Sequence, residues 1–228
     1  MATLKDFRDE RLRKLADLKA LGFNPYPAES HRTHNAGDVK TDFETLEGKQ
    51  VTVAGRVMGI RKFGKLAFIV VRDQTDEIQL FLQEGKVADR DTAAGVLSLA
   101  DLPLLDTGDF LEATGPVIKT KTGEVSVEVQ TLRLLTKALR PMPSAQDGFT
   151  NKEERMRRRY IDMNVNLDVR ERFVRRSKFW QATRDFLNHN GFIEVNVPVL
   201  EHTTGGADAN PFVTHMDALD QDFYLRIS

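Results

Sequence analysis

Five side chains between residues 56 and 81 have the chemistry of a nucleic-acid contact: Arg56, Arg61, Phe68, Gln79 and Phe81. An exposed phenylalanine can stack on an unpaired base, and such a contact contributes roughly 1–3 kcal/mol. A glutamine amide offers both a donor and an acceptor to a base edge, and an arginine can hold a phosphate or a base carbonyl. This combination of residue types favours an RNA-binding surface.

The direction of these side chains can be predicted only in part. Residues 77–82 alternate in polarity, which points Gln79 away from the apolar face, and the same argument points Arg56 outward. Phe68 stands in the apolar run 66–71, where alternation gives no direction. The alternation of inward and outward positions along the strand, taken alone, favours a place for Phe68 in the core over a stacking role.

The sequence contains no pattern of catalytic or metal-binding residues. It has no cysteine, which excludes disulfides and thiolate metal sites. His31 and His34 lie three residues apart without a convincing carboxylate partner, so we expect no metal site. A phosphate-binding Walker loop, a nucleophile elbow and a dinucleotide fingerprint are also missing from the sequence.

A β-rich region between residues 50 and 136 must position the candidate side chains. We predict strands at 51–58, 66–71, 77–82, 110–118 and 124–130, with a helix near 88–100 and a hairpin turn at 119–123. Three strands, a helix and two strands is the element order of the OB-fold, a five-stranded barrel that commonly binds oligonucleotides.

Helices are predicted on both sides of this barrel. Residues 3–21 form an amphipathic, partly basic helix, for which docking on a neighbour and contact with RNA are equally open. The prolines and polar residues of 139–148 mark a domain boundary. A basic stretch at 155–178 and a helix near 169–190 follow, and Gly191 ends that helix as a C-cap glycine should.

The overall composition is that of a globular protein with two domains. The 228 residues carry 33 Lys and Arg against 34 Asp and Glu, a net charge of -1, so any polyanionic partner must meet a local basic patch. No apolar run approaches the length of a membrane span, and we expect a cytoplasmic protein without a membrane partner.

Several stretches are similar to bacterial lysyl-tRNA synthetases, which are class II synthetases with an anticodon-binding OB domain ahead of the catalytic domain. The resemblance covers almost the whole chain and is most specific at residues 119–124, 132–141, 159–162, 211–215 and 218–227. It implies an α+β protein in which a class II catalytic domain, with an antiparallel sheet, begins after the barrel. The implied divisions are an N-terminal helix and loop at 1–48, the OB domain at 49–140, a linker at 141–154 and the start of the catalytic domain at 155–228.

The resemblance assigns the anticodon contacts to four residues of the barrel. Arg61, Phe68 and Gln79 match the anticodon-reading positions, with Phe68 stacking on the central uridine and Gln79 addressing it. Glu124 matches a further contact, for which Glu128 is the alternative. The implied RNA partner is tRNA-Lys.

Residues near the carboxyl end match the class II motif 1, whose proline lies at a dimer interface. Gly191, Phe192 and Pro198 are the matching positions, so the resemblance implies a homodimer.

Gly205, Gly206 and Ala207 resemble the loop that closes over the lysine substrate. The chain departs from the family at Asp208 and Asn210, where members usually have a small and then a basic residue.

The reaction implied by the family is formation of lysyl-adenylate from lysine and ATP with Mg²⁺, followed by transfer to tRNA. Motifs 2 and 3 are not in this sequence, so we expect no catalytic residue within it, expect the ATP and Mg²⁺ sites beyond residue 228, and expect the chain alone to be inactive. A stand-alone RNA-binding module and an aspartyl- or asparaginyl-tRNA synthetase are the alternatives.

Overall fold

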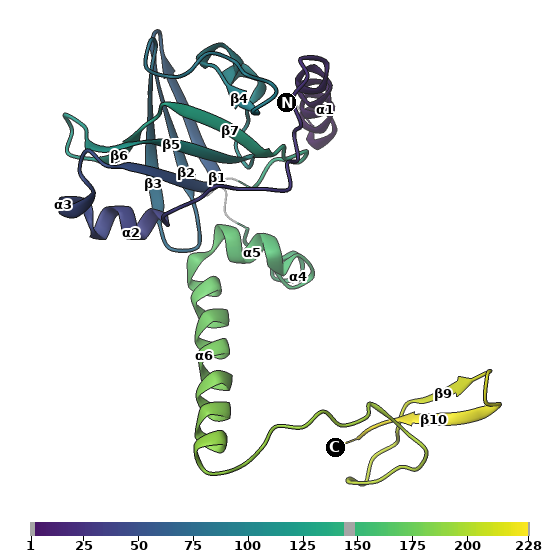
Figure 1. The fold of residues 1–228 in the computed structure, drawn as a ribbon. Coiled ribbons are helices and arrows are strands. Elements are labelled where there is room, and N and C mark those ends of the chain that lie inside the picture. The colour runs from purple at the N-terminus through teal and green to yellow at the C-terminus, as the bar shows by residue number, and fades with distance from the viewer. Residues whose placement is uncertain (1–2, 144–148, 228) are drawn as a thin grey trace. The chain divides into compact units, whose positions relative to one another are not determined.

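The computed structural model describes residues 3–143 and 149–227 (Figure 1). The chain divides into two compact units, Met1–Gly148 and Phe149–Ser228, and each is described by itself. Residues 144–148 of the predicted linker lie outside the described residues. Within the described ranges, no helix combines the length and the apolar composition needed to cross a membrane.

A closed barrel forms the centre of the first unit. Its strands are β1 (Gln50–Phe63), β2 (Leu66–Arg72), β3 (Glu77–Gln83), β5 (Phe110–Lys119) and β6 (Val125–Glu128). The β1 strand is long enough to pair with β2 through its second half and with β5 through its first half, and the parallel β3–β6 pairing completes the ring. This topology confirms the predicted OB-fold.

The last predicted strand is longer than expected and is broken. After β6 the chain continues as β7 (Thr131–Thr136), which pairs with β5 and carries the two-residue strand β4 (Val96–Leu97) at its edge. Gly115 of β5 lies beside the backbone at the break between β6 and β7. A Cβ on Gly115 would come within 1.9 Å of the Glu128 carbonyl oxygen. Only glycine, which has no Cβ, permits this close approach of the two backbone segments.

The predicted helix at 88–100 is wrong. The segment contains turns, β4 and the start of a 3₁₀-helix, η1 (Leu99–Leu104). Gly95 has a positive φ of 70°, which interrupts an α-helix, and Pro103 lacks the amide hydrogen that a longer helix would need. Local helix propensity was overridden by these two residues and by the pairing of β4 with β7.

Alternation along the strands fills the barrel as expected. Ile78, Leu80 and Leu82 are at most 1% exposed, and Gln79 and Phe81 lie on the opposite face of β3. In β2 the alternation is hidden in the sequence, yet Ala67, Ile69 and Val71 are buried on the inner face while the residues between them are partly exposed.

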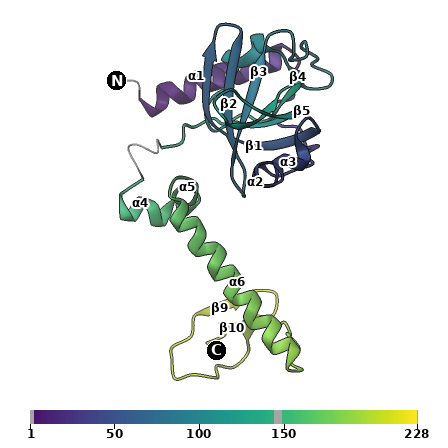
Figure 2. The same cartoon turned by 90° about the vertical axis from the view of Figure 1, so that its left-hand side faces the viewer.

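Helix α1 (Leu4–Ala20) docks against the barrel unit (Figures 1 and 2). Leu18 is fully buried, and the buried Arg11 donates to the carbonyl oxygens of Thr107, Ala138 and Arg140 at 2.8–3.1 Å. The docking alternative for this helix is thus observed. The short helices α2 (Ala36–Thr41) and α3 (Phe43–Leu46) follow it in the chain.

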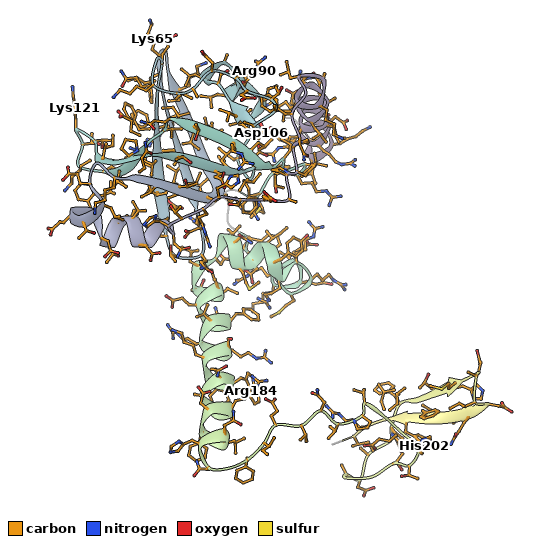
Figure 3. The ribbon with its side chains drawn as sticks, in the orientation of Figure 1. Lys65, Arg90, Asp106, Lys121, Arg184 and His202 are labelled. Atoms are coloured by element: carbon orange, nitrogen blue, oxygen red, sulfur yellow. The ribbon has the colours of Figure 1, made fainter. Side chains whose placement is uncertain are left out.

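A buried group of charges lies beneath the docked helix. Lys137 is fully buried and donates to Asp106 at 2.6 Å and to Asp109 at 2.8 Å, and Lys14 of α1 donates to the other oxygen of Asp106 at 2.7 Å. Asp106 is one of the residues labelled in Figure 3. These charges compensate one another, because an unpaired charge in such a place is strongly unfavourable.

A second buried carboxylate fastens the segment before α2 to the barrel. Glu112 of β5 is 2% exposed and accepts hydrogen bonds from Ser30 Oγ at 2.7 Å, from the His31 amide at 2.5 Å and from Arg133 at 2.6 Å. Burial by itself raises the pKa of Glu112, but these donors outweigh it and leave the pKa below its usual value.

The described residues of the second unit, 149–227, form three helices and a small sheet. The helices are α4 (Lys152–Arg157), α5 (Arg159–Val165) and α6 (Leu167–His189), and the strands are β8 (Leu200–Glu201), β9 (Val213–Met216) and β10 (Gln221–Leu225). The buried Asp162 joins the helices by accepting from Arg155 at 2.8 Å, Arg159 at 2.5 Å and Asn166 at 2.6 Å. Gly191 follows α6 with a φ of 85°, as predicted for a glycine that ends a helix.

No strand forms between Gly191 and Pro198. Residues 192–198 have no regular secondary structure and are exposed, Ile193 by 85%. A strand needs a neighbour to satisfy its backbone groups, and this segment pairs with none of the described strands.

Replacing Lys137 by methionine should strongly destabilise the first unit. The change keeps most of the side-chain volume but leaves Asp109 buried without its cation, at a cost of roughly 3–5 kcal/mol. Urea unfolding followed by circular dichroism measures this loss. The control is Arg13→Met on α1, which removes two exposed ion pairs and should have a much smaller effect, because exposed ion pairs contribute little. Equal effects of the two changes would contradict the role given to Lys137.

The Glu112 contacts predict an acid-dependent stability. Because the folded-state pKa of Glu112 is lowered, its contribution is complete above the unfolded pKa of about 4.3 and is lost as the pH falls through the folded value. Glu112→Gln should lower the free energy of unfolding at pH 7 and flatten its dependence on pH between about 5 and 3. Urea titrations at several pH values test this, and an unchanged slope would contradict it.

Candidate nucleic-acid interface

The outer face of β1, β2 and β3 brings together most of the candidate side chains. Arg61 lies directly opposite Phe68 in the β1–β2 register, and Phe68 lies opposite Phe81 in the β2–β3 register. Residues directly opposite in an antiparallel pair share a face of the sheet. Phe68 therefore points away from the core, and the core position that strand alternation alone favoured is wrong.

Three aromatic rings line this face. The rings of Phe68 and Phe81 are stacked with their centroids 5.2 Å apart and an interplanar angle of 27°. Phe63 meets Phe68 edge to face at 6.2 Å and 68°, and its side chain is 60% exposed. Partly exposed, mutually supported rings of this kind are suited to receiving an unpaired base.

The rings border a surface hollow of about 630 Å³. Arg61, Phe68 and Gln79 all line it, together with the hairpin that joins β5 to β6, from which Lys119 and Lys121 contribute. Lys121 is labelled in Figure 3. The hollow thus combines an apolar floor with cations at its rim, which suits a base with its phosphate.

A second hollow of about 320 Å³ adjoins the first, since Arg61, Gln79 and Thr122 line both. Glu124 lines this second hollow. Glu128 instead forms an ion pair with Lys86 at 2.5 Å. The geometry therefore favours Glu124 over Glu128 as a candidate contact.

The amide of Gln79 is held in place from the adjacent strand. Its Nε2 donates to the hydroxyl of Ser126 at 3.0 Å, and that hydroxyl donates to the carbonyl oxygen of Glu124 at 3.2 Å. Ser126 is fully buried and lies opposite Gln79 in the parallel β3–β6 register.

Arg56 points away from the barrel interior but does not join this set. Its guanidinium lies 4.4 Å from the centroid of the Phe110 ring and donates to the Gly108 carbonyl oxygen at 3.2 Å. Burial lowers the pKa of Arg56. It lines neither hollow, so its role in the structure is to pack on Phe110.

Sequence reasoning missed several residues that line the hollows: Lys40, Phe63, Lys119, Lys121 and Thr122. Phe63 could have been found, because it is two residues after Arg61 and so shares its face. The sequence of the hairpin between β5 and β6 indicated only a turn. The approach of this hairpin to β1 and β2 depends on closure of the barrel.

The described residues provide no metal centre. No group of three or more His, Asp or Glu side chains within residues 3–143 and 149–227 is arranged to hold a metal ion.

In the second unit, the candidate residues are exposed. Gly205, Gly206 and Ala207 lie in an irregular loop, and so do Asp208 and Asn210.

The segment after α6 is apolar and exposed. Phe192, 64% exposed, lines a shallow hollow of about 320 Å³ together with Trp180 and Leu187 of α6. Pro198 is exposed further along the segment.

Comparison with known proteins gives matches for both units. Residues 51–135 match the OB-fold nucleic acid binding domain family, and residues 151–228 match the class II tRNA synthetases for D, K and N. Relatives named lysine–tRNA ligase are 41% identical over 220 residues in Clostridium botulinum and 40% identical over 230 residues in Fervidobacterium nodosum. These alignments cover 96% and 99% of the chain but 42% and 44% of the relatives, so the chain spans less than half of their length.

Alanine substitutions at two neighbouring positions should separate the outer face from the core. Phe68→Ala removes a ring from the outer face and should leave the fold intact, whereas Ile69→Ala opens a cavity in the barrel and should cost roughly 2–5 kcal/mol. Thermal unfolding of the two variants measures the difference. A Phe68→Ala protein that fails to fold would show that this ring belongs to the core.

Proposed function

The chain belongs to the lysyl-tRNA synthetase family, and on this premise we propose that the outer face of β1, β2 and β3 binds the anticodon of tRNA-Lys. The observation that carries the proposal is the convergence of Arg61, Phe68 and Gln79 on one hollow with an aromatic floor and a basic rim. RNA-binding proteins recognise unpaired bases with this combination of stacking and edge contacts.

Each of the proposed contacts has a distinct role. Phe68 stacks on the central uridine of the anticodon, and Gln79 meets the polar edge of the same base. Arg61 lies between the two hollows and binds a phosphate or a base carbonyl. Glu124 accepts hydrogen bonds from a neighbouring nucleotide. Support for these roles comes from the shared face and from the exposure of the side chains.

In a protein with the full length of its relatives, we propose that the two units serve a lysine–tRNA ligase. Such an enzyme activates lysine with ATP and Mg²⁺ in the cytoplasm and transfers it to tRNA-Lys. The second unit contributes the beginning of the catalytic domain, and the loop Gly205, Gly206 and Ala207 covers the lysine substrate.

We also propose a homodimer formed through α6 and the segment that follows it. Phe186, Phe192 and Ile193 are each more than 60% exposed, and Trp180 is 50% exposed. Such a concentration of exposed apolar side chains is typical of a surface that is covered in an assembly. Gly191, Phe192 and Pro198 belong to this surface.

The chain should prefer an anticodon stem-loop with UUU over stem-loops with GUC or GUU. Phe68→Ala should weaken binding of the UUU stem-loop by about 1–3 kcal/mol, because one base loses its stacking partner. The measurement is fluorescence anisotropy at a fixed salt concentration. The matched control is Phe7→Ala, which removes a 50% exposed ring from α1 and should leave binding unchanged.

Two results would contradict this proposal. Equal affinities for the three stem-loops would remove the assignment to lysine, and equal losses in the Phe68 and Phe7 variants would remove the outer face as the binding site.

A further inference from the structure

The main hollow carries positive charge without a compensating carboxylate. Arg61, Lys119 and Lys121 line it, and none of its lining residues is an aspartate or a glutamate. None of these three cations forms an ion pair with a carboxylate among residues 3–143 and 149–227. In a chain whose net charge is -1, such a local excess of positive charge favours an anionic ligand.

The second hollow has a more balanced charge. Lys40 and Arg61 line it, but so do Glu77 and Glu124. Lys40 is moreover paired with Asp76 at 3.1 Å. A phosphate placed in this hollow would be repelled by carboxylates, so the main hollow suits the backbone of an RNA better.

Two hairpins border the main hollow, and their lysines have different surroundings. Lys65, between β1 and β2, lies 2.8 Å from Glu84 and lines neither hollow. Lys119 and Lys121, at the hairpin between β5 and β6, both line the main hollow. Lys65 and Lys121 are labelled in Figure 3. Of the two hairpins, the one between β5 and β6 therefore presents uncompensated charge to the hollow.

Hydrogen bonds within the β5–β6 hairpin hold its shape. The Thr120 amide donates to the Glu124 carbonyl oxygen at 3.0 Å, and the Gly123 amide donates to the Thr120 carbonyl oxygen at 2.8 Å. Lys119 is placed by the Phe43 ring, whose centroid lies 5.7 Å from Nζ, and this contact leaves the lysine charge uncompensated. A hairpin that already has its shape loses little conformational freedom when it binds a ligand.

We infer that the phosphate backbone of the bound RNA runs along the β5–β6 hairpin, with Lys119 and Lys121 as its cations, and not along the β1–β2 hairpin at Lys65. This inference rests on the proposed function, because it takes the main hollow as the RNA-binding site. It requires no particular base in the hollow, since phosphate contacts carry no sequence information. The sequence-independent part of the affinity then comes from one hairpin.

Removing one charge from the β5–β6 hairpin tests this inference. Lys121→Gln should weaken binding of the UUU, GUC and GUU stem-loops by the same factor, because it removes a phosphate contact and no base contact. The slope of the logarithm of the binding constant against the logarithm of the salt concentration should become shallower by about 0.7, the value for one phosphate of a single strand. Fluorescence anisotropy between about 50 and 200 mM salt measures both quantities.

The matched control is Lys65→Gln, which also removes one positive charge from an exposed lysine in a hairpin. A general effect of net charge would appear in both variants, whereas we expect an unchanged slope for Lys65→Gln. Combining Lys119→Gln with Lys121→Gln should make the slope shallower by about 1.4. Equal changes in the two single variants, or a change in the Lys65 variant alone, would overturn the inference.

The outcomes separate this inference from the proposed function. If the unchanged chain binds the three stem-loops equally well, the assignment to the lysine anticodon fails, while the slopes still decide whether the hairpin holds phosphates. If the chain prefers UUU and Lys121→Gln leaves the slope unchanged, the anticodon assignment stands and the role of the hairpin is overturned. A changed ratio of the three affinities in the Lys121 variant would reveal a base contact and would overturn it as well.

Discussion

The pairing of β1 with both β2 and β5 closes the sheet, and the arrangement of the candidate site depends on this closure. A small closed barrel fills its interior with side chains, so every second residue of each strand is committed to the core. The remaining residues point outward, where Arg61, Phe68 and Gln79 meet. Closure also brings β6 beside β3, which places Ser126 next to the Gln79 amide.

The chain has a net charge of -1, so its basic surface beside the aromatic rings is a local one. Two cations are buried and do not face RNA. Arg11 fastens α1 to carbonyl oxygens of the barrel unit, and Lys137 is paired with Asp106 and Asp109. The cations that line the main hollow are Arg61, Lys119 and Lys121. A local patch of this size can guide a polyanion without a large overall charge.

Much of the barrel could be predicted from sequence because its strands alternate or are bounded by turns. The direction of Phe68 could not, since β2 is apolar on both faces and only its register with β1 and β3 decides which side chains point inward. The false helix at 88–100 and the break between β6 and β7 depend on tertiary pairing and on Gly95 and Gly115. The resemblance to synthetases supplied the roles of the site residues, which neither composition nor spacing could give.

We propose that the outer face of the barrel, and not a basic helix, receives the central base of the anticodon. Photocrosslinking with 4-thiouridine at the centre of a UUU stem-loop, followed by mass spectrometry, tests it directly. We expect crosslinks to the strands that carry Phe68 and Gln79. Crosslinks confined to α1 or to the basic residues of α6 would contradict it.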